Sequence, residues 1–262
     1  PVLDYDFKSG HTSTQSVDEV INYVQDHDLS LKYIIETHAH ADHLSSAHHI
    51  KQELGGELVI GKHITEVQKI FKKVFNLDNY FKTDASQFDV LTEEGTEFML
   101  GDIKLSVMHV PGHTPADMAY IAEDTTDSEH ALAVFVGDTL FAPDVGTARV
   151  DFPGGDVDDL YHSIQKILSL PGDSEIYLCH DYPPEGRTHS PVTTVAEQKA
   201  HNIHVRDEVS KAEFVKMRTE RDATLDMPRL IIPSVQVNIR AGEMPEPEDN
   251  GVRYLKVPIN TL

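Results

Sequence analysis

The sequence is poor in cysteine and contains only one, Cys179. No intramolecular disulfide can form, which fits a reducing compartment such as the cytoplasm. There is also no run of ~18 apolar residues, the length that a membrane-spanning helix needs. Asp4 and Lys8 interrupt the stretch where a secretory signal would be apolar. We therefore expect a cytoplasmic protein without a membrane span. Because no initiator methionine precedes Pro1, we also expect the native chain to start earlier.

Positive charge is scarce as well. The chain has 22 lysines and arginines against 44 aspartates and glutamates, a net charge of -22. This argues against a nucleic acid partner, because phosphate binding needs a basic face. A small anionic substrate needs only a local basic pocket. The 262 residues suffice for a sizeable core. At roughly 150 residues per domain, the length permits one large domain or two small ones. We expect a single domain over residues 1–262, with residues 205–262 as a C-terminal extension packed on it.

Strand-like and helix-like stretches alternate along the chain, which indicates an α/β fold. Strands are expected over residues 31–35, 57–60, 103–110, 118–122, 131–136, 175–179 and 235–239. Helices are expected over residues 43–54, 67–75 and 156–168. Capping boxes at residues 16–19 and 210–213 predict two further helix starts. Gly101-Asp102 predicts a hairpin turn.

Histidine is the residue in excess: there are 16, and they cluster where apolar strands end. Residues 33–35 lead to His38, His40, Asp42 and His43, residues 107–110 to His113, residues 134–136 to Asp138, and residues 176–179 to His180. Loops at strand ends are anchored on a rigid sheet and face a crevice. Four such ends therefore indicate one shared site.

Imidazole and carboxylate are ligands that suit iron and zinc. In an extended segment a period of two puts the rings of His38 and His40 on one side. Asp42 and His43 are expected in the first turn of the following helix. A lone histidine is usually a solvated loop residue, but three histidines and an aspartate within six residues favour metal binding.

These motifs resemble those of the metallo-β-lactamase superfamily, and the resemblance covers nearly the whole chain. It rests on the run Thr37-His38-Ala39-His40-Ala41-Asp42-His43, the turn Pro111-Gly112-His113-Thr114, the pair Gly137-Asp138 and the late His180. The resemblance implies an α/β fold of the αββα sandwich type, with the metal site at the edge between two sheets.

Within the superfamily, the chain is most similar to persulfide dioxygenases (sulfur dioxygenases), especially the bacterial β-lactamase-like hydrolase subgroup linked to sulfide detoxification. The motifs behind this are Gly112-His113-Thr114-Pro115-Ala116-Asp117, Gly137-Asp138-Thr139-Leu140-Phe141, Gly146-Thr147-Ala148-Arg149, Asp151-Phe152-Pro153-Gly154-Gly155, His180-Asp181-Tyr182 and the tail Pro233-Ser234-Val235-Gln236-Val237-Asn238. Members usually carry one or two strands before the position of Pro1, which again implies a trimmed N-terminus.

The family binds one Fe(II) through two histidines and an aspartate, and the resemblance places these ligands at His38, His113 and Asp138. Such a triad leaves positions open for O₂ and a substrate sulfur. The remaining donors would orient the ligands and hold water through hydrogen bonds. They are His40, Asp42, His43 and His180. Because all seven donors are present, zinc or a dinuclear site stays open.

Three residues are expected at the substrate. By resemblance Arg149 binds a carboxylate of glutathione, a task that suits a forked guanidinium. Tyr182 is expected to contact the glutathione part or the iron pocket. Arg187 is expected to bind the substrate in a similar way to Arg149. The structural alternatives are a surface ion pair for Arg149 and core packing for Tyr182. Cys179 is expected in the core, because strand alternation turns it away from His180.

The resemblance implies oxidation of glutathione persulfide by O₂ to glutathione and sulfite. The alternative is a glyoxalase II-like dinuclear metallohydrolase of glutathione thioesters, in which two metals activate a bridging water. Against it, Asp181-Tyr182 follows the last ligand, as in the dioxygenases, whereas the hydrolases carry Glu-Tyr. A third alternative is a non-enzymatic metal or sulfide sensor. The expected partners are small molecules, with no nucleic acid and no membrane, and a homodimer is possible.

Overall fold

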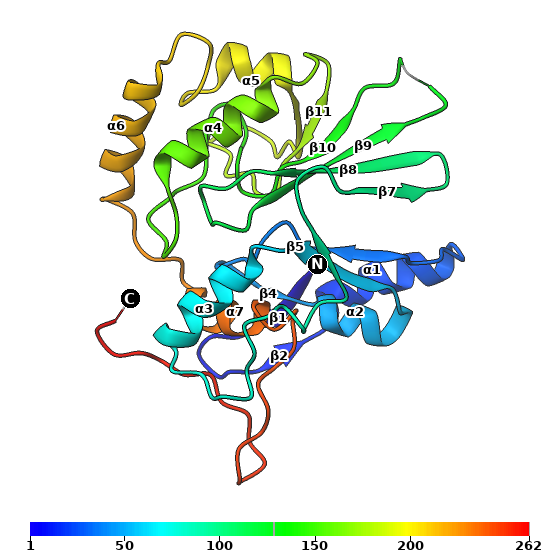
Figure 1. Ribbon diagram of the computed structural model, residues 1–262, viewed down its shortest axis with the longest axis vertical. Helices are drawn as coiled ribbons and strands as arrows, with labels where there is room; N and C mark the ends of the chain where they lie inside the picture. The colour runs from blue at the N-terminus through cyan, green and yellow to red at the C-terminus, as the bar shows by residue number, and fades with distance from the viewer. Residues whose placement is uncertain (128, 262) are drawn as a thin grey trace. The chain divides into compact units, whose positions relative to one another are not determined.

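The computed structural model describes residues 1–127 and 129–261 (Figure 1). The chain divides into two compact units. Unit 1 comprises Pro1–Leu91 and the chain from Asp226 onward, and unit 2 comprises Thr92–Leu225. The C-terminal residues after 205 are therefore shared between the units. Within the described residues, no helix combines the length and the apolar character needed to cross a membrane.

Unit 1 carries short strands in two sheets. One sheet has the order β2-β1-β4 and consists of β1 (Val2–Tyr5), β2 (Thr12–Ser13) and β4 (Leu44–Ser45). The other has the order β3-β5-β6 and consists of β3 (Tyr33–Ile35), β5 (Glu57–Gly61) and β6 (Val90–Thr92). The helices are α1 (Gln15–Asp26), α2 (Ala47–Leu54), α3 (Ile64–Val74) and α7 (Ile231–Asn238). Strands β3 and β5 run parallel, so the loop after β3 leaves the carboxyl edge of a paired strand.

Unit 2 is built on a six-stranded sheet with the order β12-β11-β10-β9-β8-β7. Its strands are β7 (Glu97–Leu100), β8 (Ile103–His109), β9 (Met118–Asp124), β10 (Ala133–Phe135), β11 (Glu175–Tyr177) and β12 (Val192–Thr194). Its helices are α4 (Val157–Leu168), α5 (Val195–His201) and α6 (Lys211–Asp222). Residues of all three helices share one buried cluster with residues of β9, β10 and β11, so these helices cover one face of the sheet (Figure 1). Ile164, Val134 and Phe214 are among the fully buried members.

Local signals in the sequence set most helix starts in unit 2. Asp156 caps α4 by accepting hydrogen bonds from the backbone N–H groups of Asp158 and Asp159. The predicted box at Ser210 is confirmed, since its side chain and that of Glu213 form both reciprocal bonds. The predicted hairpin at Gly101-Asp102 is also confirmed by the pairing of β7 with β8.

One glycine fixes the turn that carries His113. Gly112 has a φ of 138°, and a Cβ there would lie 2.3 Å from the backbone of Leu160 in α4. No side chain fits in that space, so only glycine lets the turn pack directly on the helix. The turn after β8 is thereby anchored to the core of unit 2.

Three local predictions are wrong. The alternating residues 235–239 form the end of helix α7 and the residue after it, not a half-buried strand, and Val235, Gln236, Val237 and Asn238 are all buried. The polar members of that alternation are buried because they bond to backbone groups: Gln236 Nε2 donates to the carbonyl of Ile232, for example. Burial on every side is typical of an enclosed helix rather than a half-exposed strand.

The other two errors concern helix starts in unit 1. The helix expected from residue 43 begins at Ala47, because Leu44 first pairs with Leu3 in a short sheet. Asp42 and His43 therefore lie in the loop before β4 rather than in a helical turn. The box expected at residues 16–19 is absent among the described hydrogen bonds of α1: Ser16 Oγ donates to Asp4, and the N-cap is Thr14.

Candidate metal centre

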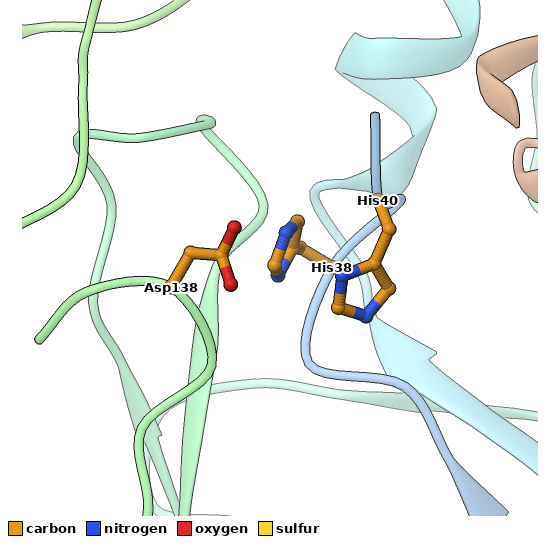
Figure 2. A group of neighbouring side chains, drawn as sticks. All are labelled: His38, His40 and Asp138. Atoms are coloured by element: carbon orange, nitrogen blue, oxygen red, sulfur yellow. The ribbon is translucent and has the colours of Figure 1, made fainter. Parts of the chain in front are cut away.

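Unit 1 gathers one set of donors in the loop between β3 and β4. His38 and His40 are buried, 1 % and 7 % exposed, and their ring centroids are 4.0 Å apart. One ligand atom each of His40, Asp42 and His43 lies within 4.8 Å of the others, a grouping that could hold a metal ion. Figure 2 shows the rings of His38 and His40 on this loop. The structure thus brings the predicted donors of this motif together.

A side chain from the far end of the sequence holds this loop. Asn238 at the end of α7 donates through Nδ2 to the carbonyls of His40 and His43, both at 2.8 Å. Its Oδ1 accepts from the backbone N–H of Ser45, also at 2.8 Å. All three are bonds to buried or partly buried backbone, which is costly to leave unsatisfied. Sequence reasoning missed Asn238, although it placed the residue in a family motif.

Unit 2 gathers the second set of donors around one carboxylate. His113 Nε2 lies 3.6 Å from Asp138 Oδ2, and His180 Nε2 lies 3.4 Å from Asp138 Oδ1. The three residues follow β8, β10 and β11, the strand ends that the sequence indicated. Figure 2 includes the Asp138 side chain at its strand end.

These separations fit metal ligation. Two donor atoms that each lie about 2.1 Å from one metal are about 3.4 Å apart at the tetrahedral angle. The imidazole–carboxylate separations at Asp138 match that spacing, and the donor types suit iron or zinc. Each of the two imidazole–carboxylate pairs in unit 2 therefore has a spacing that fits metal ligation.

Hydrogen bonding sets the orientation of the His113 ring. Its Nδ1 lies 2.8 Å from the carbonyl oxygen of Arg149. A carbonyl only accepts, so Nδ1 carries a proton, and Nε2 is the nitrogen on the side of Asp138. Close by, burial raises the pKa of Asp117 to about 6, while the charge of His113 and hydrogen bonds from Thr114 act in the opposite direction.

The predicted substrate arginines are both engaged with aspartates. Arg149 forks onto Asp151, with Nε–Oδ1 at 2.6 Å and Nη2–Oδ2 at 2.7 Å. Arg187 forks onto Asp181 and also donates to Asp144. The hydrogen bonds from Arg187 hold the pKa of Asp181 down at about 2, so this carboxyl is ionised at neutral pH.

The aromatic and sulfur groups near His180 are more open. Tyr182 is 58 % exposed and stacks on the His180 ring at 5.6 Å, with Phe141 edge-on to it at 6.0 Å. Core packing of Tyr182 is therefore ruled out. The expectation of a buried Cys179 is wrong: the residue is exposed. Strand β11 ends at Tyr177, so the alternation used to place Cys179 does not extend that far.

Comparison with known proteins places this site in a family. The sequence matches the metallo-beta-lactamase superfamily over residues 9–180. It is 53 % identical to a probable metallo-hydrolase of Burkholderia pseudomallei, over 100 % of this chain and 90 % of that one. It is 49 % identical to glyoxylase B2 of Dictyostelium discoideum, over 100 % and 87 % of the two chains. Identity to the human mitochondrial persulfide dioxygenase ETHE1 is 32 %, over 82 % and 70 %.

Solved structures agree. The crystal structure of ETHE1 from Myxococcus xanthus superposes with a TM-score of 0.68 and 28 % sequence identity, covering 92 % of this chain and 93 % of that one. The predicted fold is therefore confirmed, and the chain belongs to the metallo-β-lactamase superfamily.

Proposed function

We propose that this chain binds one Fe(II) and oxidises glutathione persulfide with O₂. The observation that carries the proposal is the similarity to persulfide dioxygenase sequences and to the ETHE1 structure, which extends over most of both chains. The proposed ligands are His38, His113 and Asp138. Two imidazoles and one carboxylate are the donor set of non-haem iron oxygenases.

The chain's own groups would hold these ligands in place. Asn238 ties the backbone of the histidine loop in unit 1, and the Arg149 carbonyl fixes the tautomer of His113 in unit 2. His180 Nε2, 3.4 Å from Asp138 Oδ1, would restrain that carboxylate through a hydrogen bond. His40, Asp42 and His43 would order water beside the site.

Bound iron would supply adjacent open positions for O₂ and the persulfide sulfur, which bring the two reactants together. The balanced reaction is GSSH + O₂ + H₂O → GSH + SO₃²⁻ + 2 H⁺, in which the outer sulfur is oxidised and O₂ is reduced. No side-chain nucleophile is needed. The proposed partners are accordingly small molecules, in a cytoplasmic protein that binds no nucleic acid; a homodimer remains part of the proposal.

Recognition of the glutathione part has to come from local positive groups, since the net charge is -22. Arg149 is the first candidate, and a substrate carboxylate there would share the guanidinium with Asp151. The exposed ring of Tyr182 is suited to packing against the peptide part. Arg187 bridges Asp144 and Asp181, an arrangement that favours a role in holding the loop after His180.

One observation favours the second candidate, a dinuclear hydrolase of glutathione thioesters. The two oxygens of Asp138 face different imidazoles, Oδ2 toward His113 and Oδ1 toward His180. A carboxylate with its oxygens divided in this way can bridge two metals, and such a pair activates water for hydrolysis. The names of the metallo-hydrolase and glyoxylase relatives point in the same direction.

A side-by-side assay separates the two candidates. Protein with a measured iron content is given glutathione persulfide while O₂ uptake is recorded, and S-lactoylglutathione while thioester loss is recorded. We expect O₂ uptake that rises in proportion to iron and is lost in His113→Ala. Thioester hydrolysis without persulfide-dependent O₂ uptake would establish the hydrolase instead.

A further inference from the structure

Helix α6 carries a buried ion pair. Arg218 is 2 % exposed and Asp222, one turn later, is 5 % exposed; Arg218 Nη2 donates to Asp222 Oδ1. Burying two charges carries a desolvation cost that often exceeds their attraction, and apolar side chains of similar volume are frequently as stable or more so. The other groups that the two side chains contact therefore indicate what the pair does.

Both members of the pair reach the backbone of a single loop. Arg218 Nη1 donates to the carbonyl of Thr147 at 3.2 Å, and Asp222 Oδ2 accepts from the N–H of Val150 at 2.9 Å. His204 adds a third contact, because its Nδ1 accepts from the N–H of Thr147 at 3.1 Å. Residues 147–150 are thus held at each end by charged or aromatic groups from the C-terminal part of unit 2.

The clamped loop carries the group that orients a proposed metal ligand. Arg149 lies between the two anchored positions, and its carbonyl oxygen is the acceptor for His113 Nδ1 at 2.8 Å. A small rotation of the 149–150 peptide would move this acceptor and with it the plane of the His113 ring. Charge-assisted bonds such as those of Arg218 and Asp222 are stronger than neutral ones, which suits them to fixing a peptide.

We propose that Arg218 and Asp222 are positioning residues for the metal centre: by clamping residues 147–150 they hold the Arg149 carbonyl where it aims His113 at the metal. The inference rests on the proposed function in so far as His113 is a ligand. The proposal gives helix α6 a role in metal binding that none of the ligand motifs indicates.

The test uses metal affinity rather than turnover. Fe(II) is titrated anaerobically into the full chain against a chromogenic chelator, and the Tm of the metal-free protein is measured in parallel. The double variant Arg218→Met, Asp222→Val removes both charges at a similar total volume, so no lone charge is left buried. We expect Fe(II) affinity to fall about 10- to 100-fold, as for loss of other groups that orient ligands, with the metal-free Tm within a few degrees of wild type, roughly the effect of a small stability change.

Matched controls separate the possible failures. Lys216 and Glu220 form an exposed pair at the same spacing on the same helix, so Lys216→Met, Glu220→Leu should leave affinity unchanged. Arg218→Lys keeps the charge but lacks the fork, so it should lose affinity partly. If the double variant does not fold, Arg218→Lys decides, and wild-type affinity in that folded variant overturns the proposal.

The remaining outcomes distinguish this inference from the proposed function. Wild-type Fe(II) affinity in the folded double variant, together with lost affinity in His113→Ala, would overturn the positioning role alone. Unchanged affinity in His113→Ala would show that His113 is not a ligand, and the proposed iron site would fail with it.

Discussion

Protonation of His204 should make this protein unstable in mild acid. The side chain is 5 % exposed, and its Nδ1 accepts a hydrogen bond from the backbone N–H of Thr147, which a protonated ring could not do. Burial, helped by the positive charges of Arg218 and Arg221, lowers the pKa of His204 from its ordinary value of 6.5 to about 4. His204 therefore binds a proton less readily in the folded chain than in the unfolded chain.

The sign and size follow from linkage. Between pH 6.5 and about 4 the unfolded state binds the extra proton, so the free energy of unfolding falls as the pH falls. Stability from this group is fully present above pH 6.5 and is lost progressively toward pH 4. At 1.36 kcal/mol per pH unit the whole window is worth about 3 kcal/mol. The part between pH 7 and pH 5 is worth about 2 kcal/mol.

The matched variant is His204→Asn, whose Oδ1 can take the place of Nδ1 as acceptor without titrating. Urea unfolding of metal-free protein at pH 7 and pH 5 gives the loss of stability for each chain. From pH 7 to pH 5, the free energy of unfolding of wild type should fall by about 2 kcal/mol more than that of His204→Asn. Other histidines titrate in both chains and cancel in the difference. His201→Asn, at an exposed position on α5, should behave like wild type.

Equal losses in wild type and His204→Asn would refute the reasoning. That result would mean that the folded protein takes up the proton at His204 near its ordinary pKa. An NMR titration of the His204 ring would then have to show a midpoint near pH 6.5.

Three further predictions concern the site. His113→Ala should lose iron while the fold, followed by circular dichroism, stays intact, because the side chain lies on a turn after a strand; full retention of iron would contradict this. Arg149→Ala should raise KM for glutathione persulfide about tenfold, with kcat changed less. The control is Arg206→Ala, which removes a half-exposed arginine paired with Glu208 and should leave KM unchanged. An unchanged KM in Arg149→Ala would place the substrate carboxylate elsewhere. Cys179→Ser should change the free energy of unfolding by no more than about 0.5 kcal/mol and keep turnover, since the residue is exposed; loss of turnover in a folded variant would refute this.

Short-range signals in the sequence predicted well what short-range physics controls. The cap at Asp156 and the box at Ser210 act within one helical turn, so the residues themselves suffice to place them. The ligand motifs at strand ends were likewise visible, because the donors follow apolar runs directly. The structure brings together His40 with Asp42 and His43, and His113 with His180 around Asp138. A single domain over residues 1–262 stays a prediction.

Contacts across long sequence separations were not predictable in this way. Asn238 and His40 are 198 positions apart, and the alternation around Asn238 looked like a strand because its polar residues bond to buried backbone instead of water. In the sequence, Arg218 and Asp222 have the spacing of an ordinary exposed ion pair on a helix. No local signal shows that both side chains are buried. Tertiary packing determines which side chains are buried and which distant backbone groups they bind.

Anomalous diffraction at the iron edge, on crystals of the iron-loaded protein, tests the proposed iron ligands most directly. We predict one iron per chain, with His38, His113 and Asp138 each contributing a ligand atom at about 2.0–2.2 Å. Two metals bridged by Asp138, or any of these three side chains more than about 5 Å from the metal, far beyond a ligand bond, would contradict it.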